Sequence, residues 1–154
     1  MSLSVLLSMI KPEGINYIDL DLMEKMCHPL AVVLFDSKKD PITHFSKHDK
    51  AKLESTLNNP QWSFYPTFSK KAAILYYGLI KNHCFENGNK RTATAALLVF
   101  LYINNLRLDD SKKEIEDYLV DLAQRVASSE GNKYMTDFLN EIEKWLDKHM
   151  AHSK

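Results

Sequence analysis

The sequence predicts an all-α protein, and three observations support this fold class. Only four Gly and five Pro occur among 154 residues, a low share of helix breakers that favours long helices over many short strands. Residues 69–82 and 89–105 are apolar around most of a helical circumference, which is typical of buried helices. Residues 111–127, which open with the capping box Ser111-Lys-Lys-Glu114, and residues 134–148 have amphipathic helical spacing. We therefore expect a helical bundle around a buried central helix, with at most a short β-hairpin flap.

The N-terminal part, residues 1–35, is expected to hold an arm followed by a helix. Apolar residues recur at helical spacing from Tyr17 to Phe35, as in an amphipathic helix. Pro29 lacks a backbone N–H, so we expect a kink or break near Cys27–His28. Residues 31–35 could also form a strand.

The remaining chain, residues 36–154, is expected to form one domain that contains the main helices. A turn at residues 36–41 leads to a short amphipathic helix, for which Ser46 is the expected N-cap and which ends at residues 58–60. Ser69 is the expected N-cap of the first buried helix.

Composition argues against several classes of function. Lys plus Arg number 20, and so do Asp plus Glu, so the chain lacks the basic excess that holds proteins on nucleic acid or anionic membranes. The longest apolar run, residues 95–103, is much shorter than the roughly 20 residues that span a membrane. Cys27 and Cys84 are too few for a disulfide framework and fit reduced thiols. We expect a cytoplasmic protein with no nucleic-acid or membrane partner.

The densest polar cluster, residues 83–91, separates the two buried helices and reads His-Cys-Phe-Glu-Asn-Gly-Asn-Lys-Arg. Free backbone N–H groups at the start of the second helix and its dipole favour an anion, and Lys90 and Arg91 add two positive charges. Gly88 permits close approach of a ligand, and His83 could take a proton from an attacking hydroxyl. The cluster predicts a phosphate-transfer site.

Each of these residues also has an ordinary structural explanation. His83 could cap the preceding helix, and Gly88 could end it. Asn89 could cap the next helix, while Lys90 and Arg91 could be solvated charges. Their combination within nine residues favours a site. A Walker phosphate loop is excluded, because its first Gly would fall at His83 and its Lys at Asn89.

The segment from His83 to Ala93 resembles the signature of the Fic/Doc family, and specifically of its death-on-curing (Doc) branch. Similarity extends over residues 40–110, and it leaves the first 35 residues unexplained. The resemblance implies a small helical enzyme that moves a phosphate-containing group from ATP to a hydroxyl of a target protein. ATP as substrate and Mg²⁺ as cofactor are part of this expectation.

The resemblance also implies a role for each residue of the signature. His83 would be the base that activates the target hydroxyl, and Phe85 would pack into the core to fix the loop. The anion-hole amides and the phosphate-binding side chain would come from Gly88, Asn89, Lys90 and Arg91.

Three positions bear on the expected reaction. AMP-transferring members have Gly where this chain has Lys90, and a second Arg where it has Thr94. Both differences favour the Doc branch, whose founding activity is phosphorylation of elongation factor Tu. The family usually has a Mg²⁺-binding Asp or Glu at the position of Asn87, whose neutral oxygen is a weaker ligand. The alternatives are therefore AMP transfer by the same site and a non-catalytic nucleotide-binding or interaction module.

The aromatic segment before the first buried helix is a candidate flap. Phe64, Tyr65, Pro66 and Thr67 lie in a Pro-bounded loop, near the place where the family has a flap that pairs with an extended target segment. Packing over the active-site loop explains them equally well. The self-inhibitory pattern of many Fic proteins is Ser or Thr, three further residues, and then Glu-Gly or Glu-Asn. It does not occur, because Val126 stands in the Ser/Thr position before Glu130-Gly131, and Met9 stands there before Glu13-Gly14. A Doc-like toxin would then need a separate antitoxin as partner.

Overall fold

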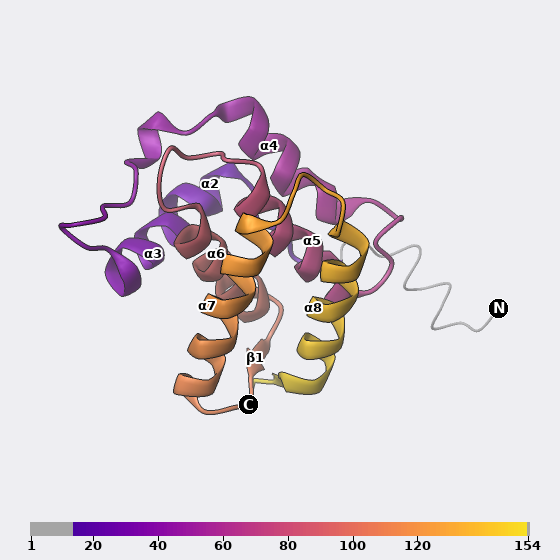
Figure 1. The fold of residues 1–154 in the computed structure, drawn as a ribbon. Coiled ribbons are helices and arrows are strands. Elements are labelled where there is room, and N and C mark those ends of the chain that lie inside the picture. Colours follow the sequence, from indigo (N-terminus) through magenta and orange to yellow (C-terminus); the bar gives the residue numbers. More distant parts are fainter. Residues whose placement is uncertain (1–13, 154) are drawn as a thin grey trace.

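The protein is mostly helical, as predicted, in a computed structural model that describes residues 14–153 (Figure 1). Most of the expected N-terminal arm, residues 1–13, lies outside the described residues. In chain order the elements are α2 (Leu20–Leu22), a π-helical turn (Met23–Cys27), α3 (His28–Phe35), a 3₁₀ turn (Phe45–Lys47), α4 (Lys50–Asn58), a 3₁₀ turn (Asn59–Gln61), α5 (Phe68–Lys81), α6 (Asn89–Ile103), β1 (Leu106–Leu108), α7 (Lys112–Ser128), α8 (Met135–His149) and β2 (Met150–His152).

The first helical segment changes its winding where the sequence predicts a break. A π-helical turn at Met23–Cys27 leads directly into α3, and Pro29 is the second residue of α3. The wider turn accommodates a proline, which cannot donate a backbone hydrogen bond to the preceding turn. Residues 31–35 are helical, so the strand alternative is not adopted.

Two predicted N-caps are wrong. Asp49, and not Ser46, caps α4 by accepting the backbone N–H three residues on at 3.1 Å. Thr67, and not Ser69, caps α5 in the same way at 3.0 Å. Both caps have the extended backbone that a capping residue needs, whereas Ser69 already lies inside the helix and its hydroxyl donates to Asp147 on α8.

The most enclosed helix is α5, which the sequence predicts to be buried together with α6. It contacts α4, α6, α7 and α8, and its residues from Lys71 to Ile80 are all buried. In Figure 1, α7 and α8 run side by side in front of it. Because α5 and α6 also pack against each other, both ends of the loop that joins them are fixed.

The two short strands pair antiparallel, with Leu106 opposite His152 and Leu108 opposite Met150. Since β2 follows α8, this sheet is not a hairpin, and it joins the chain after α6 to the end of α8. These two strands therefore do not form the expected flap hairpin.

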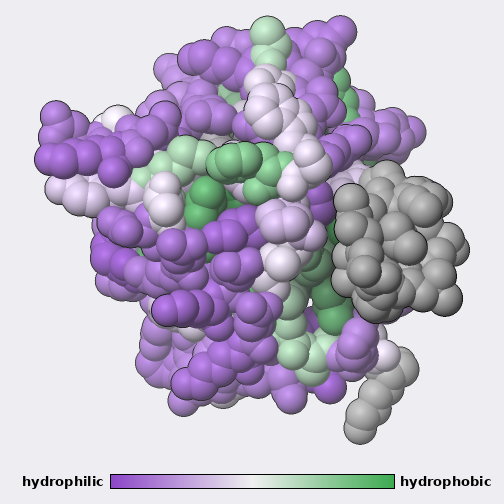
Figure 2. All heavy atoms as spheres, turned by 90° about the vertical axis from the view of Figure 1, so that its right-hand side faces the viewer, coloured by the Kyte–Doolittle hydropathy of each residue, from purple (hydrophilic) through white to green (hydrophobic). Residues whose placement is uncertain are grey.

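The face of the molecule shown in Figure 2 is mainly hydrophilic, with hydrophobic side chains exposed in limited patches. Trp62 and Phe64 are the exposed aromatic residues of the loop before α5. None of the helices within residues 14–153 has the length and apolar character that crossing a membrane requires.

Candidate active site

The loop between α5 and α6 is anchored in the core by Phe85. This side chain is 2% exposed, and its ring lies 5.6 Å from that of His28, 6.1 Å from that of Phe45 and 6.2 Å from that of His48, measured between centroids. The burial of a large aromatic ring contributes strongly to stability. It therefore fixes the middle of the loop relative to the helices around it.

The Asn89 amide closes the loop on itself. Its nitrogen donates to the Phe85 carbonyl at 2.7 Å, and its oxygen accepts the Phe85 backbone N–H at 3.0 Å. The neighbouring Cys84 carbonyl accepts the Asp49 backbone N–H at 2.8 Å. Burial raises the pKa of the Cys84 thiol, so the thiolate needed for nucleophilic catalysis is disfavoured next to His83.

Gly88 forms the N-terminal cap position of α6 with a left-handed backbone, φ 92°. A Cβ atom at this position would lie 3.0 to 3.2 Å from three atoms of Ile42, one of them its Cα. No side chain of the described residues caps α6. The N–H groups of its first turn therefore remain available to an anion.

His83 is exposed and has a left-handed backbone, φ 49°. This conformation costs a non-glycine residue about 1–2 kcal/mol, which the anchored loop around it must offset. Within residues 14–153 the imidazole makes no hydrogen bond that fixes it to the fold. The imidazole is therefore accessible to a ligand.

The two cations at the start of α6 bind different parts of the fold. Lys90 Nζ donates to Gln124 Oε1 on α7 at 2.8 Å. Arg91 donates from one terminal nitrogen to the backbone carbonyl of Asp40 at 2.6 Å and to that of Phe35 at 3.3 Å. Its other terminal nitrogen lies 3.4 Å from the Asp40 carboxylate. Arg91 thus joins α6 to the segment that follows α3.

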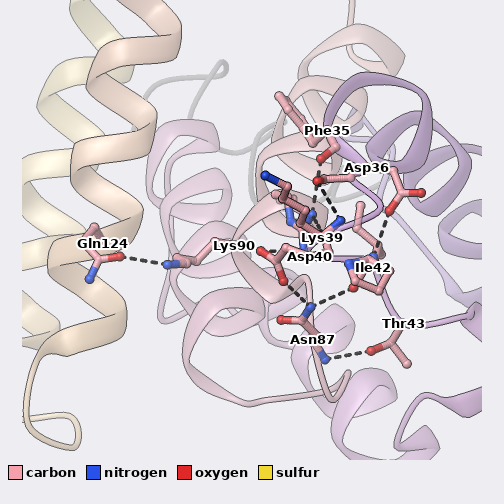
Figure 3. Close-up of polar contacts among 12 residues, drawn as sticks. Phe35, Asp36, Lys39, Asp40, Ile42, Thr43, Asn87, Lys90 and Gln124 are labelled. Atoms are coloured by element: carbon pink, nitrogen blue, oxygen red, sulfur yellow. Dashed lines mark hydrogen bonds and ion pairs between the residues drawn. The ribbon is translucent and has the colours of Figure 1, made fainter.

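That segment, residues 36–43, lies against the loop and holds Asn87 (Figure 3). The Asn87 side-chain nitrogen donates to Asp40 Oδ1 at 2.6 Å and to the Pro41 carbonyl at 2.7 Å. The backbone N–H of Asn87 donates to Thr43 Oγ1 at 2.7 Å, and its carbonyl accepts the Thr43 N–H at 3.2 Å. Four hydrogen bonds therefore fix the orientation of Asn87.

A cavity of about 710 Å³ opens beside Lys90 and Arg91. Its walls are mostly apolar side chains of α3, α6 and α7, including Leu34, Leu98 and Val120. The volume lies within the range typical of small-molecule sites. A ligand with its anionic group at the start of α6 could therefore place an apolar group in this cavity.

The structure does not bring the expected flap residues to the loop. Tyr65 is buried, Phe64 is 79% exposed, and Thr67 caps the N-terminal end of α5. His83 follows the other end of this 14-residue helix, which is about 20 Å long.

The residues that do contact the loop were missed by the sequence analysis, apart from a turn expected at residues 36–41. They lie far from the loop in the sequence and carry no local motif. Those that contact Asn87, Gly88, Lys90 or Arg91 are Phe35, Asp40, Pro41, Ile42, Thr43 and Gln124. Residues 14–153 contain no group of three or more His, Cys, Asp or Glu side chains that could hold a metal ion.

Within residues 14–153, three features define a candidate site for phosphate-group chemistry in a helical fold: an exposed imidazole on a left-handed backbone, a helix start that no side chain caps, and two cations in the first turn of that helix. The chain belongs to the Fic/DOC family, whose model matches residues 17–101. Over 84 residues it is 37% identical to a protein named Toxin Doc from Mycolicibacterium smegmatis. This match covers 50% of the chain and 65% of that toxin, slightly less than two thirds of its length. Comparison with solved structures finds no significant match.

Proposed function

We propose that the protein is a Doc-like toxin that transfers a phosphate group from ATP to a hydroxyl side chain of a target protein in the cytoplasm. The observation that carries the proposal is the exposed His83 imidazole in the anchored loop that leads into α6, where no side chain of the described residues binds the imidazole or caps the helix. A base and an anion site on one short segment are the parts that such a transfer needs.

The nucleotide would bind with its phosphates at the start of α6. The N–H groups that follow Gly88, together with Lys90 and Arg91, supply positive charge there. The neighbouring apolar cavity of about 710 Å³ has the size and character to take the nucleoside. Arg91 must exchange its contact with the Asp40 carboxylate for phosphate oxygens.

In the proposed reaction, the target hydroxyl gives its proton to His83 as its oxygen forms a bond to the γ-phosphorus. The bond between this phosphorus and the bridging oxygen breaks, and ADP leaves. Mg²⁺ bound with ATP would neutralise phosphate charge. Asn87 fits such an ion through its side-chain oxygen, because its side-chain nitrogen already donates to Asp40 and Pro41.

The second candidate is AMP transfer by the same site, and Lys90 and Thr94 favour phosphate transfer over it. Thr94 stands where AMP transferases have a second Arg, and its hydroxyl donates to the Lys90 carbonyl at 3.0 Å. The same hydroxyl lies 3.0 Å from the hydroxyl of buried Tyr76. This side chain thus offers no positive charge to a phosphate.

The target and the inhibitor follow from the proposed kind of toxin. Elongation factor Tu is the first target to examine, and a separate antitoxin would block the site in the cell. A non-catalytic nucleotide-binding module is the remaining alternative, which the neutral side chain of Asn87 favours.

Parallel reactions with ATP labelled at the α or the γ phosphate test the proposal. Purified protein and elongation factor Tu, or a cell extract, should give a labelled protein band only with the γ label. Arg91→Ala should reduce this labelling at least tenfold, whereas Arg107→Ala, beyond the other end of α6, should not. Label from the α phosphate would indicate AMP transfer instead. ATP binding without any labelled protein would favour the non-catalytic module.

A further inference from the structure

We propose that Asp40 supplies the carboxylate that binds the divalent cation of the nucleotide, in place of the acidic residue that this chain lacks at position 87. The inference rests on the proposed function, because the cation would arrive with ATP. Asp40 Oδ1 lies 2.6 Å from the side-chain nitrogen of Asn87. The fold thus brings a carboxylate from residues 36–43 next to the neutral position in the loop (Figure 3).

The hydrogen bonds of Asn87 leave its oxygen suited to a cation. Its side-chain nitrogen has two N–H bonds, and they are donated to Asp40 Oδ1 and to the Pro41 carbonyl. Among the described residues, the Asn87 side-chain oxygen has no donor. Amide and carboxylate oxygens are both ligands that Mg²⁺ prefers. In nucleotide sites, Mg²⁺ needs only one or two carboxylates besides phosphates and water.

The Asp40 carboxylate can turn to a cation without releasing Arg91. Arg91 is held at 2.6 Å by the backbone carbonyl of Asp40 and at 3.3 Å by that of Phe35. Its contact with the carboxylate is longer, at 3.4 Å, and the Asp40 side chain is 68% exposed. An exposed ion pair of this kind contributes little stability. The backbone therefore positions Arg91, while the side-chain charge remains available.

The same contacts would also allow the Asp40 carboxylate to oppose ATP binding. If its carboxylate only occupied Arg91, it would compete with the phosphates and weaken ATP binding. This competition and the proposed cation binding predict opposite effects of removing the charge when Mg²⁺ is present.

Titration of ATP by calorimetry, with Mg²⁺ or with a chelator, distinguishes them. Asp40→Asn keeps the backbone carbonyl and the acceptor for Asn87, so the fold is expected to persist, which a melting curve checks. Glu86→Gln is the matched control, because it removes the same charge from the exposed neighbour of Asn87. The double variant Asp40→Asn/Asn87→Asp moves the carboxylate to position 87.

With Mg²⁺, Asp40→Asn should weaken ATP binding about tenfold, and the double variant should restore it to within about threefold of the wild-type value. With the chelator, Asp40→Asn should not weaken binding, and Glu86→Gln should match the wild type in both conditions. Electron paramagnetic resonance of Mn²⁺ with ATP should show the same loss of bound metal in Asp40→Asn. These results would support the inference.

An equal loss with and without the metal would overturn the inference, because Asp40 would then only hold the loop. Tighter Mg²⁺–ATP binding by Asp40→Asn would overturn it in favour of competition with the phosphates. If the wild-type protein binds no ATP in either condition, the proposed function fails, and the inference fails with it. The wild-type arm alone thus separates the two failures.

Discussion

Gly88 occupies a position where a side chain would be disfavoured for two separate reasons. Its φ of 92° is left-handed, and a Cβ would lie 3.2 Å from the Ile42 Cα, which cannot rotate away. The close approach of residues 36–43 to the loop therefore depends on the absence of a side chain at this residue.

Gly88→Ala is expected to lower the free energy of unfolding by about 2–3 kcal/mol, from backbone strain and overlap with Ile42 together. Gly131→Ala is the control, since Gly131 also has a positive φ, 50°, but nothing lies within 4 Å of its added Cβ. That variant should lose only about 1 kcal/mol. Urea titrations measure both values, and equal losses would contradict the role of Ile42.

At the scale of single residues, the sequence identifies the 83–91 cluster well but not what contacts it. Gly88, Asn89 and Arg91 stand together in the chain, so their spacing is visible as a motif. Asp40 and Thr43 bind Asn87 although they lie 47 and 44 residues away from it in the sequence. Nothing in their local sequence distinguishes them from an exposed turn. Such contacts depend on tertiary packing.

At the scale of helices, the apolar periodicity of the sequence predicts which segments are helical and buried. It does not predict the exact residues at which the helices begin. Residues 69–82 are apolar nearly all round, and α5 is buried as expected. Ser69 and Thr67 are both common capping residues, so composition alone could not separate them. Thr67 caps because its backbone is extended, whereas the Ser69 hydroxyl reaches Asp147 on α8.

Glu141 joins α8 to α7 through three hydrogen bonds. Arg125 donates two, at 2.8 and 2.7 Å, and the Tyr118 hydroxyl donates the third at 2.8 Å. The bonds from Arg125, and then that from Tyr118, hold the pKa of the Glu141 carboxyl below its usual value. A lowered pKa in the folded state means that this stabilisation is present above the unfolded pKa, about 4.3, and is lost as the pH falls through the folded pKa.

Glu141→Gln is therefore expected to lower the free energy of unfolding by about 1 kcal/mol at pH 7, a modest value because the pair is partly exposed. The difference from the wild type should shrink as the pH falls from about 5 to about 3. Denaturant titrations across this range measure it, with Glu116→Gln on the exposed side of α7 as control. A difference that stays constant with pH would show that the carboxylate charge does not matter.

At the scale of the whole molecule, the fold class was predictable, but two long-range connections were not. The pairing of β1 with β2 involves three residues on each side, too few to give a strand pattern in the sequence. The contact of residues 36–43 with the loop has no periodic signal either. Together these connections determine how the ends of α6 are held: β1 follows its C-terminal end, and residues 36–43 cover its N-terminal end.

The central claim is that His83 removes the proton when a phosphate group passes from ATP to a protein hydroxyl. The most direct test compares the wild type and His83→Ala in reactions with γ-labelled ATP, with the ATP affinity of both measured alongside. We expect His83→Ala to transfer label about 10²–10⁴ times more slowly, the usual effect of losing a general base. Its ATP affinity should stay within about twofold of the wild-type value, because the phosphates bind at α6. Equal labelling by the variant and the wild type would contradict the claim.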